Sequence, residues 1–443
     1  MAVNRLNMIS YIFYLQLFLL SFIGAVIVVN NLDDHYLITR LSSDSSRFYG
    51  WASVMYTMIA MPLGMLMASV FLKQLNTKKL FDTYSFKKTE TIVSNKDSYL
   101  KLPLIMLSFI SVLAVVYTFY TIRTIPLFGV FTGKTAEMLA RMRIEASREF
   151  GGNVIFRNIF AIALTPILSY ISYAYYKASR SKGDLLWFGV MFFASVMIST
   201  YSLAKSPIVS YLLGFLLLNI LINGKISYKF LISVGTVILL ILIWSYIFIM
   251  GADVSAIPGL FLKINQGITG RLLLSQSAGT FFSFDIFPDK HPHLGISSFS
   301  NLISNVFSID KSDRSARIIM SILNPTAVEE GTAGVINSLF VGEAWANFGL
   351  LGVVFAPLWV GFVIQWSYII LLKLKKNPIF LSLMVYLTLR WPVTGGFNDF
   401  VYNAGIAMML MIFIAIICFA VMTRIVNTGK NVIMVIKKKR ADR

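Results

Sequence analysis

The feature that most constrains this chain is the repeated occurrence of apolar stretches about as long as a membrane is thick. A helix that crosses the roughly 30 Å hydrocarbon core needs about 20 mostly apolar residues. Ten stretches approach this template, near 9–29, 51–72, 102–122, 154–176, 185–203, 206–222, 230–250, 350–372, 379–391 and 403–423. Because backbone in lipid must satisfy its own hydrogen bonds, we predict an all-α membrane protein with about ten transmembrane helices, within a range of 10–12.

Composition and charge support this class and exclude others. Hydrophobic residues make up 57% of the 443 residues and charged residues 13%, against about a quarter charged in a soluble domain. The formal net charge of +19 suggests a nucleic-acid partner, but the positions of the basic residues explain it otherwise. With the N-terminus inside, the inner segments hold 23 of the 39 Lys and Arg residues, as the positive-inside rule requires. We therefore predict one membrane domain over residues 1–443, cytoplasmic termini and no nucleic-acid partner.

Two cations lie at or inside predicted spans, where an unpaired charge costs at least about 2.5–3.5 kcal/mol. Arg390 lies in the short stretch 379–391, and the glycine pair at 395–396 that follows indicates a broken or re-entrant element. It either binds an anionic substrate, pairs with Asp399 or reaches toward the membrane surface. Lys205 lies at the tip of a tight hairpin between two spans, where it either binds substrate or is simply hydrated.

Two predicted outer segments, 123–153 and 251–349, are long enough to have a function of their own. A connection of roughly 100 residues far exceeds the usual loop of about 4–6 residues, so 251–349 indicates more than a tether. Apolar residues at helical spacing in 258–275 and 314–323 predict helices lying in or near the membrane surface. Arg271, inside the first of these, is a further cation that either binds substrate or has a structural role.

The outer segment 123–153 predicts one charged amphipathic helix. Thr132 can cap its start, the glycines at 151–152 can end it, and Arg141 and Arg148 share a face with two glutamates. One interpretation is a solvated helix joined by ion pairs. The other is an anion-binding site that also includes Arg157. Arginines on the outer face are unexpected under the positive-inside rule, and their planar groups suit phosphate oxygens.

A single carboxylate stands out just before the predicted span 350–372. Glu343 lies between aromatic residues at the membrane boundary, where it should be partly desolvated, so we predict that it is a catalytic base. The alternative is that Trp345 and Phe348 anchor the interface while Glu343 pairs with an outer arginine. His291 and His293 are alternative bases, although their proline-broken run indicates a surface loop more than a metal site.

The stretch GEAWANFG at 342–349, followed by Gly352, resembles a motif of bacterial oligosaccharide repeat-unit polymerases, the Wzy-type O-antigen and capsule polymerases. The stretch TYSLAKSP at 200–207 resembles the small, basic hairpin tip of the same group. The resemblance implies a fold like that of the O-antigen ligases and other GT-C-like enzymes. It also implies a bacterial inner-membrane glycosyltransferase that joins undecaprenyl-diphosphate-linked oligosaccharide repeats on the periplasmic or outer face.

This activity predicts roles for the candidate residues. A leaving diphosphate needs its charge stabilised, and convergent cations can do this without a metal or another cofactor. The attacking hydroxyl must lose its proton to a nearby base, for which we expect Glu343. The cations to which we assign diphosphate binding are Arg141, Arg148, Arg157, Lys205, Arg271 and Arg390. Besides the lipid-linked oligosaccharide and the bilayer, a chain-length regulator protein is an expected partner.

Two other functions compete with the polymerase. A flippase or transporter for the same lipid-linked sugars would show repeated halves around a midplane site, and the sequence shows no such repeat. An O-antigen ligase would resemble its family more closely with a histidine before the glycine pair at 349 and 352. Glu343 stands there instead, which favours the polymerase.

Overall fold

The structure is a computed structural model that describes residues 7–89, 98–122, 125–225, 227–249, 251, 253, 255, 257–265, 267–330 and 333–441. Over these residues the chain forms helices and no β-strand. Nine helices are long and apolar enough to cross a membrane. These nine are Met8–Val29, Asp44–Phe71, Leu100–Thr121, Val154–Ser179, Lys182–Thr200, Lys205–Asn223, Tyr228–Phe248, Phe340–Lys373 and Asn398–Thr423. The prediction of a polytopic all-α membrane protein is therefore confirmed, while the side of the membrane on which each end lies stays a prediction.

The predicted span 379–391 is the one that differs. It forms α20, Pro378–Arg390, a helix of 13 residues. At 1.5 Å per residue this helix is about 20 Å long, which is too short to cross a 30 Å core by itself. It is followed by a turn and by the four-residue helix α21, Asn398–Val401.

Contacts between residues divide the chain into two compact units. Unit 1 comprises residues 1–87, 219–374 and 387–403, and unit 2 comprises residues 88–218, 375–386 and 404–443. Unit 1 begins with α1 (Met8–Ser10), η2 (Tyr11–Phe22) and α2 (Ile23–Val29), which form one continuous span. Its other helices before the large loop are η3 (Ile38–Arg40), α3 (Asp44–Phe71), α4 (Thr77–Phe86) and α12 (Tyr228–Phe248).

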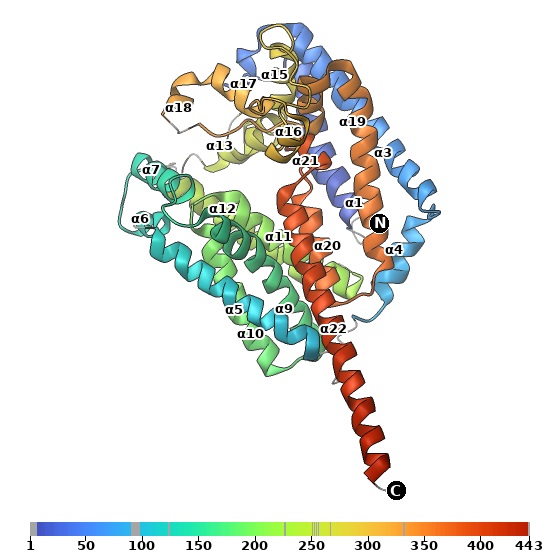
Figure 1. Ribbon diagram of the computed structural model, residues 1–443. Coiled ribbons are helices and arrows are strands. Elements are labelled where there is room, and N and C mark those ends of the chain that lie inside the picture. Colours follow the sequence, from blue (N-terminus) through green and yellow to red (C-terminus); the bar gives the residue numbers. More distant parts are fainter. Residues whose placement is uncertain are drawn as a thin grey trace. The chain divides into compact units, whose positions relative to one another are not determined.

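The centre of unit 1 is the packing of α3 along the long helix α19, Phe340–Lys373 (Figure 1). Glycines allow the two backbones to approach closely, because a Cβ on Gly361 would lie 2.1 Å from the Met61 carbonyl oxygen. Small residues at helix crossings serve this purpose in membrane proteins. A buried hydrogen bond of 2.9 Å from Gln365 Nε2 to Ser69 Oγ joins the same pair of helices further along.

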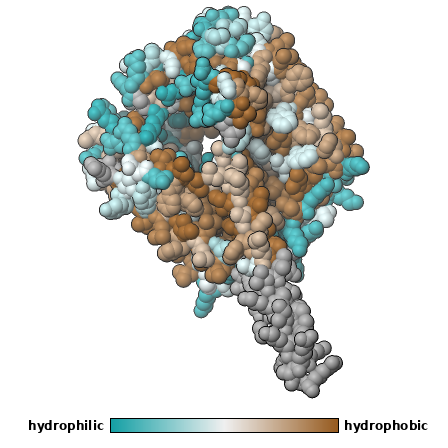
Figure 2. All heavy atoms as spheres, in the orientation of Figure 1, coloured by the Kyte–Doolittle hydropathy of each residue, from teal (hydrophilic) through white to brown (hydrophobic). Residues whose placement is uncertain are grey.

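The large loop of unit 1 folds into short helices near the start of α19, next to α21 (Figure 1). They are α13 (Ile257–Leu262), α14 (Gly267–Gly270), η6 (Arg271–Ser275), α15 (Ala278–Ile286), α16 (Asn301–Phe307), α17 (Ser315–Leu323) and α18 (Pro325–Glu329). The predicted helix 258–275 is thus interrupted, with Gly267 at φ +63°, whereas 314–323 corresponds to α17. In Figure 2 hydrophilic residues gather over these short helices, and hydrophobic residues cover the long ones.

Unit 2 is a helical bundle with an aromatic centre. Its helices are α5 (Ser98–Thr121), α6 (Pro126–Phe131), α7 (Ala136–Ser147), α8 (Val154–Phe156), η4 (Arg157–Leu164), α9 (Thr165–Ser179), α10 (Lys182–Thr200), α11 (Lys205–Asn223) and α22 (Ala404–Ala441). Tyr170 of α9 donates its hydroxyl to the Tyr211 carbonyl of α11 at 2.8 Å, and Phe215 packs edge-on against Tyr170. Buried aromatic rings thus join the helices of this bundle.

The single outer helix predicted between 132 and 151 is wrong in its bounds. The helix between these positions is the shorter α7, Ala136–Ser147, and Thr132 is the C-cap of the preceding helix α6. The cap of α7 is Thr135, whose side chain accepts a hydrogen bond from the Met138 N–H. Threonine is a common cap, and Thr135 takes this role three residues after Thr132.

Candidate functional site

The site is built on the first turns of α19, which contain the stretch predicted from the sequence. The helix is interrupted at Gly349, whose φ of 58° and ψ of −139° lie in a region open essentially only to glycine. Just before the interruption, the carbonyl oxygens of Ala346 and Asn347 accept the N–H groups of Leu294 and Gly295 at 3.0 and 2.9 Å. The interruption therefore provides the acceptors that fasten the large loop to α19.

Glu343 lies in the first turn of α19 and is almost completely buried, at 2% exposure. Its Oε1 accepts Arg314 Nε at 2.8 Å, and its Oε2 accepts Arg314 Nη2 at 2.9 Å. Oε2 also accepts the backbone N–H of Asn398 at 2.9 Å. Such a two-point contact with arginine is strong and directional. Both carboxylate oxygens are thus engaged by donors.

A glycine lets the chain pass close to this ion pair. A Cβ on Gly396 would lie 2.2 Å from Arg314 Nη2 and 2.4 Å from Glu343 Oε2. Any side chain at this position would therefore displace the ion pair. The glycine pair, which the sequence associates with a broken or re-entrant element, lies in the turn between α20 and α21, and this turn contacts the Glu343–Arg314 pair.

Arg314 is held by a second carboxylate as well. Its Nη1 lies 3.0 Å from Asp399 Oδ2, and its side chain remains 40% exposed, while that of Asp399 is 27% exposed. Burial lowers the pKa of the Arg314 guanidinium, but the hydrogen bonds and charges of Glu343 and Asp399 outweigh burial and raise this pKa. Arg314 therefore stays charged and is fixed between two acids.

A closed ring of buried hydrogen bonds joins the segments that carry Glu343 and Asp399. Asn347 Nδ2 donates to Asn398 Oδ1 at 2.7 Å, and Asn398 Nδ2 donates to the Ser298 carbonyl at 2.9 Å. Ser298 Oγ donates back to Asn347 Oδ1 at 2.9 Å. All three residues are buried. Asn347 lies one helical turn after Glu343, so the ring fixes α21 and its Asp399 relative to α19.

The Glu343–Arg314–Asp399 group forms part of the wall of a cavity of about 560 Å³. The cavity is lined by Ser298, Phe299, Ser300, Lys311, Ser312, Asp313, Arg314, Ala316, Arg317, Val335, Ile336, Asn337, Glu343, Gly395, Asn398, Asp399 and Tyr402. Three cations and three carboxylates therefore face one space, together with amide, hydroxyl and aromatic groups. Arg317 makes no side-chain hydrogen bond or ion pair within the described residues, which leaves its guanidinium open to a ligand.

Two arginines of unit 1, Arg271 and Arg390, were predicted from the sequence to bind substrate, and neither lines this cavity. Arg271 is exposed on η6, and Arg390 is exposed at the end of α20. Asp399, considered as a partner for Arg390, makes its ion pair with Arg314. The sequence did not single out Arg314 or Arg317. The available signal was that both lie on the predicted outer helix 314–323, one helical turn apart.

The remaining predicted cations belong to unit 2. Arg141 forms an exposed ion pair with Glu137 at 3.3 Å, and Arg148 ends α7. Arg157 is 4% exposed, donates to the Ala146 and Ser147 carbonyls at 3.2 Å, and lies over the Phe150 ring. Arg157 therefore fastens the C-terminal end of α7 to η4.

Lys205 begins α11 and is partly buried, and the three residues of the hairpin tip at 201–203 are buried. The hairpin tip is therefore packed and not simply hydrated. That Lys205 and the three arginines of unit 2 meet Glu343 around one cavity stays a prediction.

The histidines and aromatic residues near Glu343 have packing contacts. His293 lies edge-on to Trp345 at 5.5 Å, and Trp345 Nε1 donates to the Phe287 carbonyl at 2.9 Å. Neither His291 nor His293 lines the cavity. The described residues contain no group of three His, Cys, Asp or Glu side chains that could hold a metal ion.

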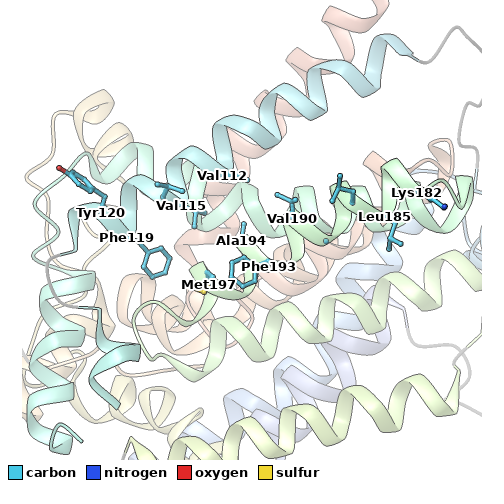
Figure 3. A pocket seen from close by; sticks show the side chains of 13 residues that line it. Val112, Val115, Phe119, Tyr120, Lys182, Leu185, Val190, Phe193, Ala194 and Met197 are labelled. Atoms are coloured by element: carbon cyan, nitrogen blue, oxygen red, sulfur yellow. The ribbon is translucent and has the colours of Figure 1, made fainter. Parts of the chain in front are cut away.

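A larger cavity of about 1020 Å³ lies in unit 2 between α5 and α10. Figure 3 shows Val112 and Phe119 of α5 and Val190 and Phe193 of α10 along it. Its lining is apolar except at Tyr120 and Lys182, so it has the character of a lipid-facing groove.

Comparison of the chain with protein-family models, with curated protein sequences and with solved structures finds no match.

Proposed function

We propose that this protein is a glycosyltransferase of the Wzy type, which polymerises undecaprenyl-diphosphate-linked oligosaccharides on the outer face of the bacterial cytoplasmic membrane. The observation that carries the proposal is the cavity in the large loop, where Arg314 is fixed between Glu343 and Asp399. A site for this reaction must accept sugar hydroxyls, stabilise a diphosphate and provide a base. The cavity combines groups for all three tasks.

In the proposed reaction, a hydroxyl of the acceptor repeat attacks the anomeric carbon of the donor sugar. The bond from this carbon to the diphosphate oxygen breaks, and the lipid diphosphate leaves with the electron pair. Lys311, Arg314 and Arg317 are the lining cations that can stabilise its charge. The hydroxyl proton passes to a carboxylate, and the products are a longer lipid-linked chain and free lipid diphosphate.

The choice of base follows from the contacts of the acids. Glu343, the base predicted from the sequence, has both oxygens engaged by Arg314 and Asn398. Asp399 is more exposed and contributes only Oδ2 to its ion pair. We therefore assign proton abstraction to Asp399 and assign Glu343 to holding Arg314 in place. The outer cations of unit 2 and Arg271 and Arg390 remain candidate contacts for the lipid diphosphate.

The test is the surface glycan of a deletion strain. Loss of a polymerase leaves glycan of a single repeat, loss of a flippase leaves none exposed, and loss of a ligase leaves polymer on the lipid carrier. We expect a single repeat in the deletion strain and a full ladder after complementation.

An Asp399→Asn variant, confirmed to be inserted, should not restore the ladder. The matched control is Asp310→Asn, which changes an exposed acid of the same loop outside the cavity. A normal ladder in the deletion strain or in Asp399→Asn contradicts the proposal.

A further inference from the structure

A second polar cavity of unit 1 lies near the other end of α19, where no catalytic residue has been assigned. Its volume is about 290 Å³. Three elements far apart in sequence form its wall: the start of the first span, the helix α4 and the last turns of α19. The lining residues are Asn7, Ile9, Ser10, Phe13, Tyr14, Thr77, Lys78, Phe81, Asp82, Gln365 and Tyr368.

The polar groups of this cavity are arranged for a ligand with two opposite charges. Lys78 and Asp82 are four residues apart on α4, so they lie on one helical face. The Lys78 ammonium makes no hydrogen bond or ion pair with any described residue. A cation and an anion about one helical turn apart match a zwitterion better than they match a simple anion.

Tyr368 gives an independent indication that something polar binds here. This side chain is 2% exposed, and its hydroxyl has no hydrogen-bond partner among the described residues. Buried hydroxyl groups in proteins are nearly always hydrogen-bonded, to protein or to another molecule. A partner in the adjoining cavity would satisfy it.

The surroundings of the cavity indicate that the ligand also has an apolar part. Large apolar side chains are exposed on the elements that form or adjoin the wall: Phe18 at 41% on η2, Phe71 at 68% at the end of α3 and Phe86 at 77% on α4. The cavity lies at the end of one transmembrane helix and the start of another, which is the depth of lipid headgroups. A ligand with a charged head and an apolar tail fits both environments.

We propose that this cavity binds the headgroup of a zwitterionic phospholipid that carries a primary amine, of the phosphatidylethanolamine type. The phosphate lies at Lys78 and the Tyr368 hydroxyl, and the ammonium group faces Asp82. The lipid thereby joins the first span, α4 and the end of α19. This inference does not rest on the glycosyltransferase proposal, because no residue that lines the cavity around Arg314 takes part.

The test uses the purified full-length protein in a detergent free of phospholipid, titrated with dihexanoyl phosphatidylethanolamine. A ligand that binds only the folded state raises Tm with concentration. We expect saturable stabilisation, an apparent Kd at least about tenfold weaker for Lys78→Gln, and a clear weakening for Tyr368→Phe. The control is Lys79→Gln, which removes the exposed neighbouring cation outside the cavity and should bind like wild type. Tyr368→Phe should keep the Tm of the lipid-free protein, because its hydroxyl has no hydrogen-bond partner among the residues that the structure describes.

Three results would overturn the proposal. Equal stabilisation by phosphatidylglycerol would show that the amine is not recognised, and equal stabilisation by inorganic phosphate would show that no lipid is needed. Unchanged affinity in both Lys78→Gln and Tyr368→Phe would place any lipid effect outside this cavity.

Discussion

At the level of single residues, the site depends on two positions where only glycine fits. These positions determine which contacts the neighbouring side chains and carbonyl groups make. Gly349 exposes the carbonyls that fasten the large loop, and Gly396 allows the Glu343–Arg314 pair to lie against the chain. These glycines belong to the motif and the glycine pair visible in the sequence. Their physical role, however, is evident only when the loop is seen bound to α19.

The Gly349→Ala variant should therefore be destabilised by about 1–3 kcal/mol, because alanine is strained at this φ and ψ. Its Cβ would also lie 3.1 Å from His293 Nε2. Thermal unfolding in detergent measures the effect, and protease cleavage within 287–312 should rise. Gly151→Ala is the matched control, since nothing lies within 4 Å of a Cβ there. Equal stability of the two variants would contradict the role assigned to Gly349.

His35 predicts a pH dependence. Burial lowers the pKa of this imidazole, although Asp33 and Asp34 act in the opposite direction. The unfolded state then binds more protons between the lowered pKa and about 6.5, so stability should rise with pH through this window and become constant above it. Unfolding measured from pH 5 to pH 8 tests this. The slope should shrink in His35→Gln, and a slope of the opposite sign would show that the folded protein favours the charged form.

Among the helices, buried polar contacts hold the short ones in place. Two arginines that look alike in the sequence differ in this respect, because only one of them makes such contacts. Arg157 donates to the last carbonyls of α7, where a cation also complements the helix dipole. Arg141 lies on the same helix but only forms an exposed pair with Glu137. The sequence assigned both to substrate binding, because spacing shows which residues share a helix face but not which ones become buried.

We expect Arg157→Gln to lose roughly 2–3 kcal/mol of stability and to expose α7 to hydrogen exchange. Arg141→Gln should change stability by no more than about 0.5 kcal/mol. Amide hydrogen exchange across 136–148 compares the two variants directly. Fast exchange in both, or in neither, would show that Arg157 does not fasten α7.

At the scale of the whole molecule, the transmembrane helices could be predicted because each is a local run of apolar residues. The candidate site could be predicted only in part. Glu343 stands out locally, whereas its partner Arg314 is 29 residues away and Asp399 belongs to a different short helix. Pairing between distant segments leaves no periodic signal in a single sequence. For the same reason the base was placed on Glu343, whose engaged oxygens no pattern could reveal.

The predicted sidedness has a direct test because Cys418 is the single cysteine. In a Cys418→Ser background, we expect Asp310→Cys to react with a membrane-impermeant maleimide added to intact spheroplasts, since charge counting places 251–349 outside. Lys229→Cys, in the first turn of α12 on the predicted inner side, should react only after permeabilisation. The reverse pattern would invert the topology and remove the cavity from the outer face.

We propose that the cavity around Arg314 transfers sugar chains from one lipid diphosphate to another. The most direct measurement incubates the purified protein in lipid nanodiscs with the lipid-linked repeat unit of its source strain. We predict lipid-linked products of two or more repeats, with one lipid diphosphate released per repeat joined, and no product from Asp399→Asn. Undiminished product from Asp399→Asn, or no product from folded wild-type protein, would contradict the account.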